Sequence, residues 1–81
     1  MAEIKSITLT HKETVEAIIK YQNIHEGIWQ LYVEFGIGAA NIATGPDQFS
    51  PAAIVPINKI GLLRVEQEGP LTVDASKINP A

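Results

Sequence analysis

The clearest period-two pattern of apolar side chains lies in residues 28–37, with the sequence IWQLYVEFGI. Side chains of a strand alternate between two faces, so this stretch predicts a central strand with one wholly apolar face. That face, which is predicted to form the floor of the core, consists of Trp29, Leu31, Val33, Phe35 and Ile37. The opposite face is only half polar and consists of Ile28, Gln30, Tyr32 and Glu34. Its incomplete polarity makes it a candidate for contact with another molecule.

The stretch after residue 10 has the helical period instead. Thr10 and Glu13 form a T-H-K-E capping box, which begins a helix. Gly27 is a candidate for the left-handed residue that ends it, so the helix is predicted from about residue 11 to about residue 25. Its apolar side chains cover an arc of about 220°, more than twice the stripe that docks a helix on a sheet. The flank that one sheet would leave uncovered holds Ala17, Tyr21 and Ile24.

A helix this apolar is predicted to be covered on two sides. The pattern contains only one helix, so the second cover would have to come from another copy of the chain.

The sequence also predicts one strand before the helix, and a loop and a returning strand after the central strand. Residues 2–9 alternate well enough to predict a short first strand. Turn-forming residues at Gly45-Pro46-Asp47 and Ser50-Pro51 predict a loop at about residues 44–51 that closes a long hairpin. The returning strand is predicted over residues 58–66. Pro56 cannot donate to a ladder, so the segment before that strand is predicted to be an edge, a bulge or irregular.

The end of the chain predicts little regular structure. Residues 71–73 add a short final strand, and the tail from about residue 74 is predicted to be weakly ordered. The predicted fold is a single α+β domain over residues 1–81 in the order β-α-β-β. Its small, largely antiparallel, twisted sheet carries one amphipathic helix on one face. The first and central strands could also pair in parallel through a right-handed crossover.

Composition sharpens the expectation of assembly. The chain has 81 residues, of which 46% are hydrophobic, and it has no cysteine. Disulfides and thiolate metal sites are therefore excluded as sources of stability. Between Gly27 and Asn58 the only charged residues are Glu34 and Asp47. A domain of this size buries only about 60–65% of its unfolded surface, so much of this neutral stretch is predicted to meet partner subunits.

Charge argues against nucleic acid and membrane as partners. The formal net charge is −3, and the six basic residues are scattered along the sequence, whereas phosphate contacts need clustered Lys and Arg. There is no polybasic run, no apolar core of a signal peptide, and no apolar run near the ~20 residues of a membrane-spanning helix. The expected partner is the chain itself, with another protein as a further partner, and the expected location is cytoplasmic.

The two histidines do not predict a metal site. His11 and His25 would lie about 21 Å apart along the helix, too far to share one ion within a subunit. No third ligand has a recognisable spacing, and no cofactor is predicted. At the C-terminal end of the helix, a protonated His25 is favoured by the helix dipole, which gives it a structural role. The alternative is that His25 acts in ligand binding or proton transfer.

Glu34 has three interpretations. It is a solvated charge on the outer sheet face, an interface ion pair with Lys59 or Arg64, or a catalytic acid whose pKa burial would raise. No second carboxylate has the local spacing of an acid/base pair, and no serine lies in a nucleophile elbow. The sequence GIGAAN lacks the third glycine of a phosphate-binding loop. An enzyme is therefore less favoured, and its site would have to be shared between subunits.

The aromatic residues divide between core and surface. Trp29 and Phe35 are predicted to fill the core, and Tyr32 is predicted to contact another subunit. The favoured function is a small structural or interaction module that forms homo-oligomers. The alternative is a small-molecule-binding protein whose pocket, between helix and sheet or between subunits, includes His25, Trp29 and Glu34.

Overall fold

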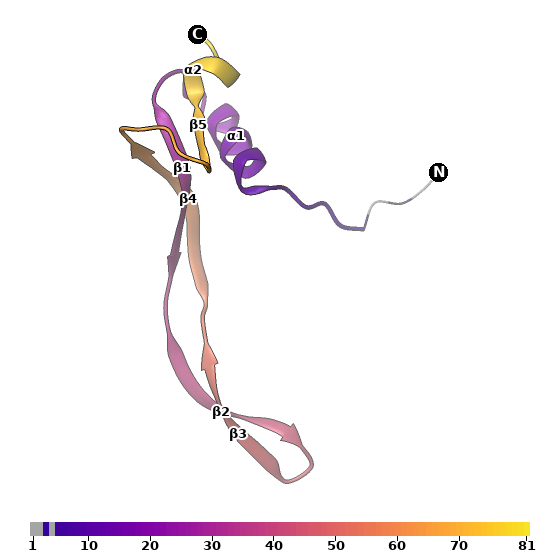
Figure 1. The fold of residues 1–81 in the computed structure, drawn as a ribbon. Coiled ribbons are helices and arrows are strands. Elements are labelled where there is room, and N and C mark those ends of the chain that lie inside the picture. The colour runs from indigo at the N-terminus through magenta and orange to yellow at the C-terminus, as the bar shows by residue number, and fades with distance from the viewer. Residues whose placement is uncertain (1–2, 4) are drawn as a thin grey trace.

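The computed structural model describes residue 3 and residues 5–81, and Figure 1 shows them as a small head from which a long two-stranded arm projects. The elements follow in the order α1 (His11–Tyr21), β1 (Ile28–Phe35), β2 (Gly38–Gly45), β3 (Gln48–Ile54), β4 (Ile57–Val65), β5 (Thr72–Asp74) and α2 (Ala75–Ile78). We call residues 32–61 the arm, and residues 10–31 and 62–79 the head. The molecule measures 60 × 43 × 21 Å, and both the arm and the extended residues 5–9 before α1 project from the head (Figure 1).

Helix α1 begins as predicted. The Glu13 N–H donates to the Thr10 hydroxyl at 3.1 Å, and the Glu13 carboxylate accepts from the Thr10 N–H at 2.8 Å. These reciprocal bonds satisfy two of the donors that a helix leaves unpaired at its N-terminus. The capping box is therefore confirmed.

The predicted end of α1 is wrong, because the helix stops at Tyr21 rather than near residue 25. Asn23 adopts the left-handed conformation with φ 56°. Its N–H donates to the Lys20 carbonyl at 3.2 Å, and the Ile24 N–H donates to the Ile19 carbonyl at 3.0 Å. This pair of bonds is the Schellman motif, in which asparagine can replace glycine.

The core lies where α1 crosses the sheet. Among the described residues, the buried apolar side chains are Val15, Ile19, Val73 and Ala75. The partly buried side chains packed against them are Ile24, Trp29, Leu31, Leu62 and Ile78.

The predicted core floor on β1 is thus confirmed only for its first part. Trp29 and Leu31 pack against the core, whereas Phe35 and Ile37 are 56% and 79% exposed. An 11-residue helix is about 16 Å long and an eight-residue strand is about 27 Å long, so α1 cannot cover all of β1.

The sheet topology corrects the predicted order. The fold is α+β with small antiparallel sheets, as expected, but there are two of them: a three-stranded sheet β4-β1-β5 in the head and the two-stranded β2-β3 hairpin. The helix precedes every strand of the described chain. Of the predicted first strand, residue 3 and residues 5–9 form no strand, and residues 2 and 4 lie outside the described residues. A strand-like sequence becomes a strand only where a neighbouring edge accepts its hydrogen bonds.

The long hairpin itself is confirmed, with a tighter turn than predicted. The turn lies at Pro46 and Asp47, where Asp47 has φ 58°. Because the turn is this short, Pro51 lies within β3 rather than in a loop. The irregularity predicted near Pro56 is present: β3 ends before this residue, and the β1–β4 register shifts between Glu34 and Phe35.

The C-terminal segment forms a short helix, which differs from the expected weakly ordered tail. The Asp74 carboxylate caps α2 by accepting from the Ser76 N–H at 3.0 Å and from the Ser76 hydroxyl at 2.6 Å. Ala75 is fully buried, and its N–H donates to the Gly27 carbonyl at 2.9 Å. This hydrogen bond and the burial of Ala75 hold the C-terminal segment against the residue that precedes β1.

Candidate functional site

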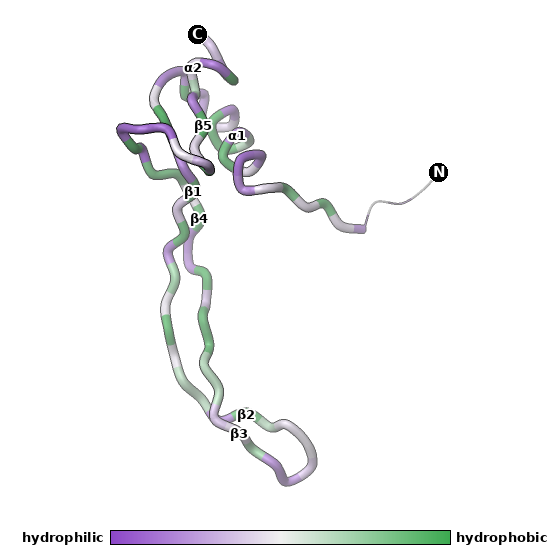
Figure 2. Tube along the Cα trace, in the orientation of Figure 1, coloured by the Kyte–Doolittle hydropathy of each residue, from purple (hydrophilic) through white to green (hydrophobic). Residues whose placement is uncertain are grey.

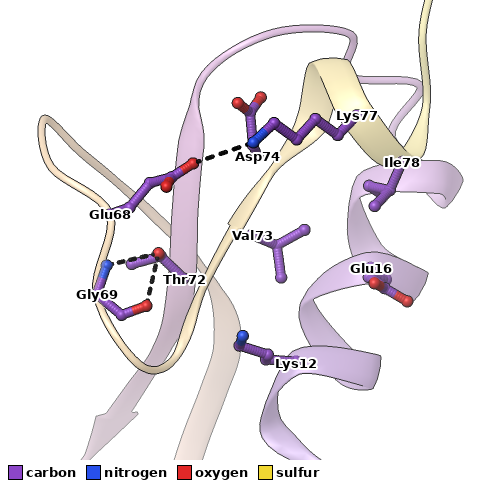
Figure 3. A pocket seen from close by; sticks show the side chains of 9 residues that line it. All are labelled: Lys12, Glu16, Glu68, Gly69, Thr72, Val73, Asp74, Lys77 and Ile78. Carbon is purple, nitrogen blue, oxygen red and sulfur yellow. Dashed lines mark hydrogen bonds and ion pairs between the residues drawn. The ribbon is translucent and has the colours of Figure 1, made fainter.

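A pocket of about 280 Å³ lies between α1, β5 and α2, and Figure 3 shows the side chains around it. It is lined by Lys12, Glu16, Glu68, Gly69, Thr72, Val73, Asp74, Lys77 and Ile78. Its volume falls just below the ~300 Å³ at which small-molecule sites begin, and its charges are mixed in sign. The pocket therefore lacks the set of converging polar groups that would define a ligand.

The polar groups of this pocket bond mainly to near neighbours. The Thr72 hydroxyl accepts from the Gly69 N–H at 2.8 Å and donates to the Gly69 carbonyl at 3.1 Å. Lys77 and Glu68 form an ion pair at 3.8 Å between two well-exposed side chains, a type that contributes little stability. These contacts close a turn and support a short helix.

The pKa of Asp74 is lowered from its ordinary value of 3.8. The main cause is the hydrogen bond from the Ser76 hydroxyl, followed by the bond from the Ser76 backbone N–H and by the charge of Lys77. Each of these favours the ionised carboxylate. Asp74 is therefore held as a helix-capping anion rather than as a proton donor.

Two of the predicted ligand-binding residues, His25 and Trp29, have structural contacts in the head. The His25 Nδ1 donates to the Asn79 carbonyl at 2.8 Å, and the Asn79 side-chain amide donates to the Ile24 carbonyl at 2.9 Å. These bonds join the α1–β1 connection to the C-terminal segment. The Trp29 Nε1 donates to the Glu26 carbonyl at 3.0 Å.

The Arg64 guanidinium lies over the Trp29 ring, 5.8 Å from the ring centroid. Glu34 is exposed and lies five residues further along β1, directly opposite Lys59. An odd separation along a strand places Glu34 and Trp29 on opposite faces of the sheet. The structure therefore does not bring His25, Trp29 and Glu34 into one pocket. In the part of the chain that the structure describes, no group of three or more His, Cys, Asp or Glu side chains is placed to hold a metal ion.

The predicted interface residues are placed differently from one another. Ala17 and Tyr21 lie exposed on the outer flank of α1, with Tyr21 86% exposed. Tyr32 is 44% exposed at the base of the arm. Ile24 instead packs against the core of its own head, because the chain turns back after Asn23.

Most of the exposed large hydrophobic side chains of the described residues lie in the arm. Figure 2 shows pale and apolar residues along most of it. Its exposed large hydrophobic side chains are Tyr32, Phe35, Ile37, Ile42, Phe49, Ile54, Val55, Ile57 and Ile60. The nearly uncharged stretch from Gly27 to Asn58 predicted contact with a partner, and the turn residues predicted a long hairpin, but neither pattern predicted that the hairpin projects from the head.

The chain exposes more surface than a compact protein of its mass. Its accessible surface is 6653 Å² for 8.8 kDa, whereas compact monomers of this mass expose about 4,800 Å². Its radius of gyration is 18.5 Å, against about 12 Å for a compact domain of this length. The excess surface is therefore about 1,900 Å².

Comparison with protein-family models, with curated proteins and with solved structures found no match to this chain. Within the described residues, neither helix has the length and apolar character needed to cross a bilayer.

Proposed function

We propose that this chain is a structural module that assembles with copies of itself, with the arm as the principal contact surface. The observation that carries the proposal is the excess of about 1,900 Å² of exposed surface over a compact monomer. A stable interface of standard size buries about 800 Å² per partner, so the excess is sufficient for one or more such contacts.

The size of the core supports the same proposal. Among the described residues, only four apolar side chains are buried, and only two of the larger ones, Val15 and Ile19, are fully buried. A chain this short has little hydrophobic gain to set against its conformational entropy. Burial of the arm against other copies would supply apolar area that the head does not provide.

The charge of the arm also supports self-association. Its charged residues are Glu34, Asp47 and Lys59, and Glu34 lies directly opposite Lys59 in the β1–β4 register. Opposite charges at paired positions leave this part of the arm nearly neutral. Two arms can therefore approach each other with little electrostatic repulsion. Tyr32, beside this pair, offers a ring and a hydroxyl of the kind enriched at interfaces.

The test is the molar mass of the chain by size-exclusion chromatography with light scattering, over a range of concentrations from micromolar upward. We expect a mass that is a multiple of 8.8 kDa and a melting temperature that rises with concentration. A folded protein of 8.8 kDa at every concentration would refute the proposal.

A matched pair of variants distinguishes association through the arm from non-specific association through any exposed apolar side chain. Phe49→Lys places a charge on the arm at a side chain that is 73% exposed, and Leu71→Lys does the same in the head at 52% exposure. We expect the first variant to dissociate and the second to assemble like the unmodified chain.

A further inference from the structure

The two edges of the β2–β3 hairpin are not equivalent. Pro51 lies in β3 directly opposite Asn41 of β2. A proline has no backbone N–H, so it fits a two-stranded ribbon only where its nitrogen faces away from the partner strand. The outer edge of β3 therefore has a proline ring and no donor at the middle of the strand. This edge is blocked against the addition of another strand.

The outer edge of β2 is open. The same pairing directs the N–H and C=O of Asn41 away from β3, and strand alternation directs those of Ala39 and Ala43 the same way. All three residues are exposed, and within residue 3 and residues 5–81 the only strand paired with β2 is β3. The sequence of β2, GAANIATG, contains neither a proline nor a charged residue, which are the usual protections of an edge strand.

We propose that the open edge of β2 pairs with the β2 edge of a second copy, antiparallel and about a two-fold axis at Asn41. The product is a continuous four-stranded sheet with β3 of each copy on the outside. This inference rests on the proposed function, self-association through the arm, and specifies one backbone contact within that interface.

Symmetry favours a second copy as the occupant. The outward positions Ala39, Asn41 and Ala43 are evenly spaced about Asn41, so an antiparallel copy aligns Ala39 with Ala43 and Asn41 with itself. Such a contact is isologous and forms about six backbone hydrogen bonds. No charge on either strand opposes it.

The edges that remain after pairing also favour a second copy as the partner of β2. After two β2 edges have paired, the edges left on the outside of the four-stranded sheet both carry Pro51. Further strands cannot add there, so the pairing ends at two copies instead of continuing as a fibre.

Asn41→Pro tests the proposal, with Ala53→Pro as the matched control. Each substitution removes one outward N–H from the hairpin: the first from the open edge, the second from the edge that Pro51 already blocks. By light scattering, we expect Asn41→Pro to raise the dissociation constant at least about tenfold, because it removes hydrogen bonds and introduces a ring at the contact. Ala53→Pro is expected to assemble like the unmodified chain.

The outcomes separate this inference from the proposed function. A monomeric unmodified chain refutes the proposed function and this inference with it. An assembled unmodified chain whose Asn41→Pro variant assembles equally well overturns the edge pairing alone.

Amide hydrogen exchange on the unmodified assembly covers the case in which Asn41→Pro fails to fold. We expect the outward amides of Ala39, Asn41 and Ala43 to be protected as strongly as the inward amides of Ala40 and Ile42. Fast exchange at the three outward amides in the assembled protein would overturn the proposal.

Discussion

The head and the arm use the same backbone hydrogen bonding to different effect. In the head, β1 and β4 carry α1 across one face, and the buried side chains of the described chain all lie there. In the arm, the same two strands and their β2–β3 continuation form antiparallel ladders, with register shifts after Glu34 and Ala43 and with both faces open (Figure 1). A two-stranded hairpin is at best marginally stable alone. The hydrogen-bonded ladder therefore specifies the shape of the arm, whereas the stability of the arm has to come from burial of its faces.

The largest expected effect lies in the head core. Ile19→Ala removes a fully buried side chain from a core with few others, and we expect a loss of about 2–5 kcal/mol in the free energy of unfolding. The matched arm variant is Ile42→Ala, where the side chain is 47% exposed, and there we expect a much smaller loss at concentrations where the chain is monomeric. Urea denaturation measures both. Equal losses would contradict the difference between head and arm.

The next effect comes from Gly27, at the connection between α1 and β1. Gly27 has φ 101°, and a Cβ there would lie 2.8 Å from the Trp29 Nε1. Gly27→Ala is therefore strained both by its backbone and by its neighbours, and we expect a destabilisation of about 1–3 kcal/mol. Gly38→Ala is the control, because a Cβ there would meet no atom within 4 Å. A melting temperature unchanged by Gly27→Ala would count against this account of the connection.

A smaller effect on stability, with a clear effect on assembly, is expected at Tyr32. Tyr32→Lys places a charge at the base of the arm, where the tyrosine is 44% exposed. The head should fold as before, since Tyr32 lies outside the core, but the assembly should weaken because a charge at an apolar contact costs free energy on desolvation. Circular dichroism and light scattering read the two effects separately. Unaltered assembly in this variant would remove Tyr32 from the interface.

The smallest effect is a dependence of α2 on pH. Because the folded-state pKa of Asp74 lies below 3.8, its capping contribution is fully present above pH 3.8 and is lost as the pH falls through the folded-state value. The amide shift of Ser76 should report this loss, and the arm should show no matching change. In Asp74→Asn the acid transition should disappear, because asparagine caps without titrating.

The sequence predicted those parts of the fold that depend on local chemistry. The capping box of Thr10 and Glu13 is a complete signal within four residues. The alternation of β1 and the turn residues around Pro46 likewise predicted a strand and a hairpin that the structure contains. Each of these patterns carries its own hydrogen-bond partners or its own backbone preference.

The remainder depended on contacts that local patterns do not encode. The prediction placed the end of α1 at Gly27, whereas the helix ends before Asn23, because asparagine can also adopt the left-handed conformation that glycine adopts routinely. The alternating apolar face of β1 predicted a core along its whole length, yet only the length of α1 determines how much is covered. Small residues such as Ala39 and Ala43 are compatible with the close approach of a partner, but they do not specify a strand edge, so local pattern alone does not predict the proposed contact at β2.

The most direct test of the proposed arm contact is amide hydrogen exchange at two concentrations, one above and one below the point at which the chain assembles. We expect protection of the arm amides, residues 32–61, to fall sharply on dilution, while protection in the head around Val15 and Ile19 changes much less. Equal protection of the arm at both concentrations, with a mass of 8.8 kDa on dilution, would show that the arm is stable without a partner and would refute its stabilisation by self-association.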